Sequence, residues 1–235
     1  MEAAITDRTK AIIAVHLNGR MAEMDMVSAI AKKYKLVLIE DAAQAIGAAH
    51  QGHQIGYYSD AACLSFNPHK ILGTYDGGAV ISNRPDIAEK VSLMRTYGAR
   101  PGEIHRRHPL VGVSSHLSPL HASILRVQLA KLPFFIQRSR ENCFRYAENL
   151  EGMGDLVFPH DASDENFFNG HRFFAFTSGR DRLKQFLEDH GIRGYIYIDH
   201  SVPLPFFEVL NRRNCKKGDF PIAERIAKEA IFLPT

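Results

Sequence analysis

Two short apolar segments of the chain each end in residues that could take part in chemistry. Leu36–Ile39 runs directly into Glu40 and Asp41, and Ala61–Phe66 is followed four residues later by Lys70. Both segments have the length and composition of buried strands, and ligands bind at the carboxyl ends of strands in an open parallel sheet. We therefore expect Asp41 and Lys70 to project into one crevice. A carboxylate facing a primary amine suits a cofactor that forms an imine with the lysine and holds a pyridinium nitrogen against the acid.

The segments around these residues alternate between strand and helix patterns. Residues 11–17 form an apolar run, residues 21–33 carry apolar side chains at helical spacing, and residues 36–40 form the second apolar run. This succession predicts a βαβ unit and hence a parallel sheet. The later patterns predict a hairpin or turn over 50–56, strands over 61–66 and 78–82, a helix over 86–96 and a helical stretch over 119–151 with a break near Pro133.

The pattern changes near residue 152. A strand over 173–176, a helix over 180–190 that ends at Gly191, and a strand over 195–198 predict a small α+β domain. The fold class is therefore α/β, and we predict three parts: a partial cofactor-binding large domain over 1–115, a connecting helix over 116–151 and a small C-terminal domain over 152–235.

Composition argues against several classes of protein. The 235 residues are 45% hydrophobic and 23% charged with a net charge of +3, and the basic runs lack interleaved aromatics, so we expect no nucleic-acid partner. We expect neither a signal peptide nor a membrane span, because no apolar run is long enough to cross a bilayer. Three widely spaced cysteines, Cys63, Cys143 and Cys215, indicate neither a disulfide framework nor a zinc site, and a reducing cytoplasm is the expected location.

Four short motifs occur in a fixed order: Thr9–Gly19, Glu40–Gln44, Ser65-Phe66 with Lys70 five positions after Ser65, and Asp76–Val80. Weaker similarity continues through Arg126–Leu129 to Gly218–Arg225 and so covers most of the chain. In this order and spacing the motifs resemble the DegT/DnrJ/EryC1/StrS family of sugar aminotransferases, which use pyridoxal 5'-phosphate. The resemblance implies a partial aspartate-aminotransferase-like (fold type I) large domain with a mainly parallel sheet, followed by the small domain.

The resemblance assigns the central roles to Lys70 and Asp41. Lys70 would carry the cofactor and move the proton at the α-carbon, and Asp41 would keep the pyridine nitrogen protonated. The alternatives are a surface lysine and an aspartate that caps a helix over 42–49. Gln44, one turn further along that helix, would contact the cofactor ring near its phenolic oxygen or would be an exposed glutamine. Ser65 would donate to the phosphate or serve a turn at the end of its strand.

Two further residues are candidates by position in the family. Ser114 stands where the family usually has an asparagine that reaches the phosphate of the neighbouring subunit. His200 lies in the region that borders the substrate, although a loop histidine is often merely solvated. Gly73, with the nearby glycines Gly77 and Gly78, is expected to let the backbone turn tightly behind Lys70.

The resemblance implies transfer of an amino group from an amino acid, glutamate or glutamine, to a keto-sugar, nucleotide-linked, or a keto-cyclitol. Two alternatives remain: a truncated non-catalytic or complementing subunit, and a sugar dehydratase. Lys70 counts against the second, because such relatives have histidine in its place. Met1–Thr6 resembles an internal segment of the family and Ile231–Thr235 precedes its last helix, so we expect a homodimer or a complementing chain that supplies the N-terminal segment.

Overall fold

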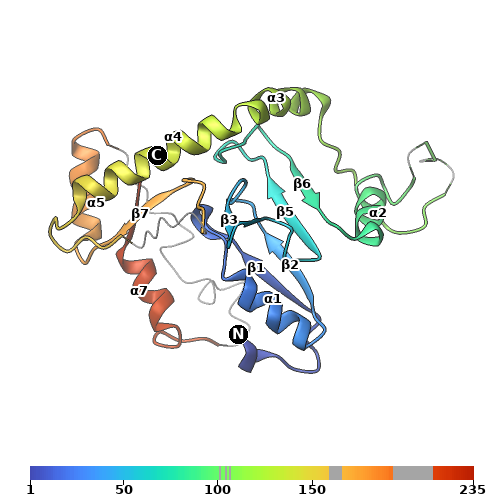
Figure 1. Cartoon of the computed structure of the whole chain (residues 1–235), viewed down its shortest axis with the longest axis horizontal. Coiled ribbons are helices and arrows are strands. Elements are labelled where there is room, and N and C mark those ends of the chain that lie inside the picture. Colours follow the sequence, from blue (N-terminus) through green and yellow to red (C-terminus); the bar gives the residue numbers. More distant parts are fainter. Residues whose placement is uncertain (101, 104, 106, 159–165, 193–213) are drawn as a thin grey trace. The chain divides into compact units, whose positions relative to one another are not determined.

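The computed structural model describes the chain except for residues 101, 104, 106, 159–165 and 193–213. The chain divides into two compact units. The first unit contains residues 1–138 and 162–171, and the second unit contains residues 139–161 and 172–235. Each unit has its own sheet (Figure 1).

A four-stranded sheet organises the first unit. Its order is β1 (Ala11–Val15), β2 (Val37–Asp41), β5 (Ala61–Ser65) and β6 (Gly78–Ile81). The first three strands run parallel, and β6 runs antiparallel to β5. The four strands and the mainly parallel sheet were all predicted from the apolar runs, and these predictions are confirmed. The carboxyl ends of β1, β2 and β5 consequently meet at one edge of the sheet.

One face of this sheet is covered by a helix. Ile12, Ala14 and Leu38 point to that face and pack against Met24 and Val27 of α1 (Met24–Lys33). Successive residues of a strand point to opposite faces, so the neighbours of these core residues point the other way. We call this second side the open face; it carries Ile13, Val15 and Val37, which are 64%, 53% and 38% exposed. Both faces of a parallel sheet are ordinarily covered.

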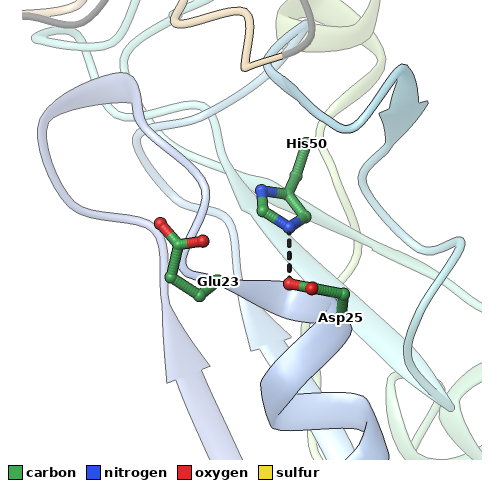
Figure 2. Close-up of side chains that lie close together, drawn as sticks. All are labelled: Glu23, Asp25 and His50. Carbon is green, nitrogen blue, oxygen red and sulfur yellow. Dashed lines mark hydrogen bonds and ion pairs between the residues drawn. The ribbon is translucent and has the colours of Figure 1, made fainter.

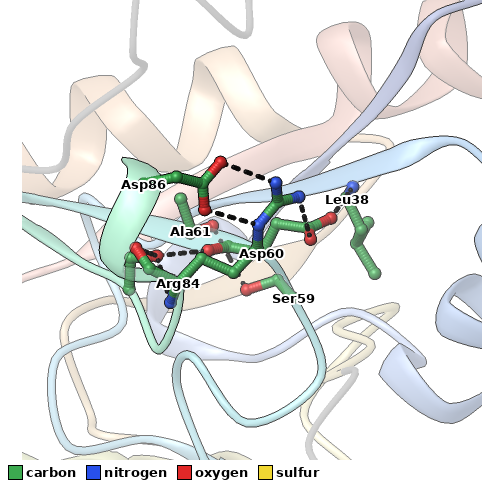
Figure 3. A network of polar contacts seen from close by, with 7 residues as sticks. Leu38, Ser59, Asp60, Ala61, Arg84 and Asp86 are labelled. Atoms are coloured by element: carbon green, nitrogen blue, oxygen red, sulfur yellow. Dashed lines mark hydrogen bonds and ion pairs between the residues drawn. The ribbon is translucent and has the colours of Figure 1, made fainter. Parts of the chain in front are cut away.

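A polar network holds β2, β5 and β6 together at the edge opposite their candidate functional residues (Figure 3). The Asp60 carboxylate accepts the backbone N–H of Leu38 at 2.9 Å and pairs with the Arg84 guanidinium at 3.1 Å. Its backbone carbonyl accepts the hydroxyl of Ser82 at 2.6 Å. Arg84 also binds Asp86 through two nitrogens. One residue before β5 thus connects three strands.

The predicted hairpin after β2 is confirmed. Strands β3 (Ala49–His50) and β4 (His53–Gln54) pair antiparallel. The two residues between them, Gln51 and Gly52, have φ angles of +48° and +75°. Positive φ at both central residues is typical of a type I′ turn, which matches the twist of the flanking strands.

The predicted helices of the middle of the chain are present. They are α2 (Pro85–Met94), α3 (Pro119–Ala130) and α4 (Leu132–Leu150), and the short 3-10 helices are η1 (Glu2–Ala4) and η2 (Leu17–Gly19). The break between α3 and α4 falls at Lys131, two residues before Pro133, as the sequence predicts. Across the described residues, no helix combines the length and apolarity that a bilayer span requires.

The second unit is a small α+β arrangement. Strands β7 (Phe173–Phe176) and β8 (Ala230–Leu233) pair antiparallel, and helices α5 (Arg180–Asp189) and α7 (Pro221–Glu229) accompany them. Phe173 and Ile231 are fully buried at its centre. The strand expected over 195–198 lies outside the described residues.

Candidate functional site

Asp41 is the last residue of β2 and is held from two sides. Its backbone carbonyl accepts the N–H of His16 at 3.0 Å, and its carboxylate accepts the N–H of Ala43 at 3.1 Å. This second bond spans two residues and forms an Asx turn, which competes with helix formation. Turns occupy the segment after it, and Gly47 has a φ angle of +77°. The alternative in which Asp41 caps a helix over 42–49 is therefore wrong.

Gln44 is positioned by η2, the short 3-10 helix that follows β1. Its side-chain oxygen accepts the N–H of Asn18 at 2.8 Å. Asn18 has a φ angle of +58°, and its own side-chain oxygen is buried without a partner in the described part of the chain. Asn169 fixes the same turn, because its amide donates to the carbonyls of Gln44 and Ile46 at 2.9 and 3.0 Å. The turn after Asp41 is thus built from three separate stretches of the chain.

Asp41, Cys63 and Ser65 share the open face of the sheet. Asp41 pairs in register with Val15 on one side and Cys63 on the other. Ser65 lies two residues beyond Cys63 in β5 and so points to the same side. Partial burial of the thiol, followed by the negative charge of Asp41, raises the pKa of Cys63. The register therefore brings a carboxylate and a hydroxyl together on one side of the sheet.

Lys70 lies in a tight loop that follows β5. The hydroxyl of Ser65 accepts the N–H of Asn67 at 3.3 Å, and the carbonyl of Asn67 accepts the N–H of Lys70 at 3.0 Å. Gly73 closes the loop: a Cβ atom there would lie 2.6 Å from the carbonyl oxygen of Asn67 and 3.2 Å from that of Lys70. The prediction that glycine allows a tight turn behind Lys70 is confirmed at Gly73. Lys70 itself is half-buried.

A buried pair beneath this edge was not found by sequence reasoning. The side chains of His16 and Glu40 are both 0% exposed, and Nε2 of His16 lies 2.7 Å from Oε2 of Glu40. The N–H of Ala22 donates to Nδ1 of His16 at 3.2 Å, which places the ring proton on Nε2. Glu40 also accepts hydrogen bonds from Ser59 and Gly56.

The electrostatics of Glu40 follow from these bonds. Burial by itself would raise the pKa of Glu40, but the hydrogen bonds from His16 and Ser59 outweigh it and hold the pKa below its ordinary value. A signal for this pair exists in the sequence, because Glu40 lies two residues after Leu38 in β2 and must therefore face the same covered side, whereas Asp41 faces the other.

Two candidates remain, Ser114 and His200. Ser114 is exposed, and its segment forms a single antiparallel bridge with Thr96. Among the hydrogen bonds of the described residues, none joins Ser114 to Asp41. His200 lies outside the described residues. The first unit thus gathers Asp41, Gln44 and Ser65 at one edge of its sheet.

The fold and the motifs at this edge define the class of protein. The chain belongs to the DegT/DnrJ/EryC1/StrS aminotransferase family, whose family model matches residues 1–235. The predicted partial fold-type-I architecture is confirmed by the crystal structure of S. venezuelae DesV in complex with a ketimine intermediate. The DesV chain is 35% identical in sequence and superposes with a TM-score of 0.92. The match covers 99% of the present chain and 62% of the DesV chain.

Two curated relatives match over the full chain. A "Pleiotropic regulatory protein" of Geobacillus stearothermophilus is 40% identical, and this chain covers 62% of it. A dTDP-3-amino-3,4,6-trideoxy-alpha-D-glucose transaminase of Streptomyces venezuelae is 35% identical, and this chain covers 60% of it. The chain therefore spans somewhat less than two thirds of the length of these relatives.

Proposed function

We propose that this chain supplies the lysine and the acid of a pyridoxal-phosphate-dependent aminotransferase. The reaction is transfer of an amino group from an amino acid (glutamate or glutamine) to the acceptor. The acceptor is a nucleotide-linked keto-sugar or a keto-cyclitol. The observation that carries the proposal is the register of β2 and β5, which sets Asp41 and Ser65 on one face at the carboxyl ends of parallel strands. Relatives named as transaminases of nucleotide-linked amino sugars support the substrate class.

The donor set of this edge fits the cofactor. A carboxylate, a hydroxyl and an amine follow neighbouring parallel strands, and the buried oxygen of Asn18 has no partner among the described residues. The bound cofactor supplies an electron sink that acidifies the α-C–H bond of the amino donor. Asp41 accepts a hydrogen bond from the pyridinium nitrogen, and Ser65 donates one to a phosphate oxygen. Lys70 holds the cofactor and moves the proton at the α-carbon.

Gln44 completes the ring contacts in this proposal. Its side-chain oxygen already accepts the N–H of Asn18, so the amide's orientation is fixed and its NH₂ group faces away from that bond. We assign this group to the phenolic oxygen of the cofactor. Ser114 contributes its hydroxyl to the phosphate in a neighbouring copy, and His200 contacts the substrate.

The partner in this proposal covers the open face. Ile13 and Val15 are more than half exposed there, and β1 has a neighbouring strand on one side alone within the described sheet. An exposed apolar sheet face and an unpaired strand edge both favour association. A homodimer or a complementing chain with the N-terminal segment of the family would cover both.

The second candidate is a complementing subunit that does not catalyse by itself. It is favoured by the same open face. A sugar dehydratase is disfavoured because, by the resemblance, the chain has a lysine, Lys70, where dehydratase relatives have histidine. Titration of pyridoxal phosphate with and without a polypeptide that carries the N-terminal segment separates the two readings: tight binding by this chain alone supports a self-sufficient enzyme.

The assignment of Lys70 is tested by trapping. The protein is incubated with pyridoxal phosphate, reduced with borohydride and digested, and the labelled peptide is identified by mass. We expect the label on Lys70 and loss of visible absorbance in Lys70→Ala, while Lys90→Ala, an exposed lysine of α2, behaves as the wild type. A label on another lysine would overturn the assignment.

A further inference from the structure

Three side chains that the proposed reaction does not use gather at the start of α1 (Figure 2). Glu23 is the N-cap residue of α1, Asp25 lies in its first turn, and His50 is the last residue of β3. One ligand atom from each residue, two carboxylate oxygens and an imidazole nitrogen, lies within 4.8 Å of the other two. Within the described part of the chain, no other three His, Cys, Asp or Glu side chains are grouped in this way.

The imidazole of His50 is held in a fixed direction. Its side chain is 3% exposed, and Nε2 lies 2.8 Å from a carboxylate oxygen of Asp25. The ring packs edge-on against Tyr58 with 5.8 Å between centroids, and the hydroxyl of Tyr58 donates to the backbone carbonyl of His50 at 3.3 Å. These contacts hold the ring of His50 in one rotamer, with Nε2 directed at the carboxylate of Asp25.

The carboxylates leave negative charge at this point. The side chain of Glu23 does not cap α1, and among the described residues it takes part in no hydrogen bond or ion pair. The hydrogen bond from His50, followed by a backbone hydrogen bond from Met26, lowers the pKa of Asp25. Two carboxylates close to one imidazole offer more acceptor oxygens than the single ring N–H can satisfy, and a cation can bind the remainder.

We propose that Glu23, Asp25 and His50 bind one divalent transition-metal ion of the zinc class. One imidazole nitrogen and two carboxylate oxygens are a ligand set that zinc accepts, with water in the fourth position. Ligand atoms around a tetrahedral zinc ion lie about 3.4 Å apart. The contact between Nε2 of His50 and Asp25 must widen from its 2.8 Å, and the exposed Glu23 side chain must turn inward. The metal takes the place of the proton on Nε2, so the ring binds with its proton on Nδ1.

The metal would connect two segments that are 25 residues apart, the first turn of α1 and the β3–β4 hairpin. The positive end of the helix dipole at the start of α1 opposes a cation, so the site is expected to be weaker than one built from ligands in mid-helix. The second carboxylate offsets this effect. We therefore expect a site that is filled reversibly and that adds to the stability of the fold with the logarithm of the free metal concentration once this exceeds the Kd.

The test is titration of the full chain with Co²⁺, whose visible absorption reports its ligands. We expect one equivalent to bind through nitrogen and oxygen, and Zn²⁺ to displace it. His50→Gln and Glu23→Gln should each weaken binding by about tenfold or more. His53→Gln is the matched control, because His53 is exposed, pairs with His50 across the hairpin and stacks on Tyr57 instead.

The proposal would be overturned by the absence of saturable Co²⁺ binding at millimolar metal, or by equal affinity in the wild type and both variants. A sulfur-to-cobalt charge-transfer band that persists in both variants would also overturn it, because Cys63 is exposed and could bind the metal instead. Glu23→Gln changes an exposed residue, so its circular dichroism should match the wild type and its loss of affinity reports the ligand itself.

Discussion

The imidazole of His16 donates a hydrogen bond to the carboxylate of Glu40 at 2.7 Å, and both side chains are fully buried. The pair joins the end of β1 to β2 directly beside Asp41, whose carbonyl also accepts the backbone N–H of His16. The position of Asp41 at the sheet edge consequently depends on a residue that cannot itself reach a ligand on the open face.

His16→Leu is expected to reduce the free energy of unfolding by about 3 kcal/mol, because it leaves the buried carboxylate of Glu40 with two of its three hydrogen-bond donors. Urea unfolding followed by circular dichroism measures the change. His69→Leu, an exposed histidine, serves as control and should stay within about 0.5 kcal/mol of the wild type. A similar small loss for His16→Leu would mean that the pair contributes nothing to the fold.

Gly73→Ala is expected to displace the loop that carries Lys70, because the new Cβ atom would lie 2.6 Å from the carbonyl oxygen of Asn67. We expect weaker binding of pyridoxal phosphate by about tenfold or more with the same far-ultraviolet circular dichroism. Gly179→Ala is the matched control, since its nearest neighbour would be at 3.5 Å. Unchanged cofactor affinity in Gly73→Ala would mean that the conformation of this loop does not matter for cofactor binding.

Asp155 gives the second unit a defined dependence on pH. Its carboxylate accepts hydrogen bonds from the hydroxyl and N–H of Ser178 and from the hydroxyl of Thr177, and these bonds lower the pKa of Asp155 from 3.8 to about 2. Because the pKa is lower in the folded state, the ionised carboxylate stabilises the fold above about pH 3.8, and this contribution is lost as the pH falls through about 2.

Asp155→Asn should therefore lower the urea midpoint near neutral pH, and its difference from the wild type should shrink as the pH falls below about 4. Urea titrations at several pH values give both quantities. Asp189→Asn, at the exposed end of α5, should show a smaller difference at every pH. A difference between Asp155→Asn and the wild type that stays constant down to about pH 2 would contradict the assignment.

Ile13→Lys is expected to block association through the open face. Ile13 is 64% exposed, so the substitution should change the stability of the single chain little, while a charge in an apolar interface is costly. Sedimentation velocity at increasing concentration measures association. Val111→Lys, at a residue that is 91% exposed and outside the sheet, is the control. Equal association of Ile13→Lys and the wild type would place the interface elsewhere.

Most regular elements were predictable because their apolar periodicity is local. The strands of the first sheet and helices α1 and α5 follow directly from that pattern. The segment after Asp41 was misjudged because its alanines favour a helix, whereas the Asp41 carboxylate captures the N–H of Ala43 and starts a turn. Strand β8 follows α7 without a turn signal, and its pairing with β7 is a long-range contact.

The contacts that fix the candidate site were harder to predict. His16 and Glu40 are 24 residues apart in the sequence, and Gln44 and Asn18 are 26 residues apart, so no local pattern predicts either contact. The strand ends, by contrast, are local features, and they placed Asp41 and Ser65 at the sheet edge in advance. Sequence reasoning thus located the edge, and the tertiary contacts determine how its side chains are held.

The Asp60 network has a consequence for the opposite end of the strands. A slip of one residue between β2 and β5 would turn Cys63 and Ser65 to the covered side and leave Asp41 with no hydroxyl beside it. The bonds of Asp60 to Leu38 and Arg84 resist this slip from the far edge (Figure 3). The alignment of Asp41 with Ser65 therefore depends on Asp60, which lies at the other end of the strands and takes no part in the chemistry.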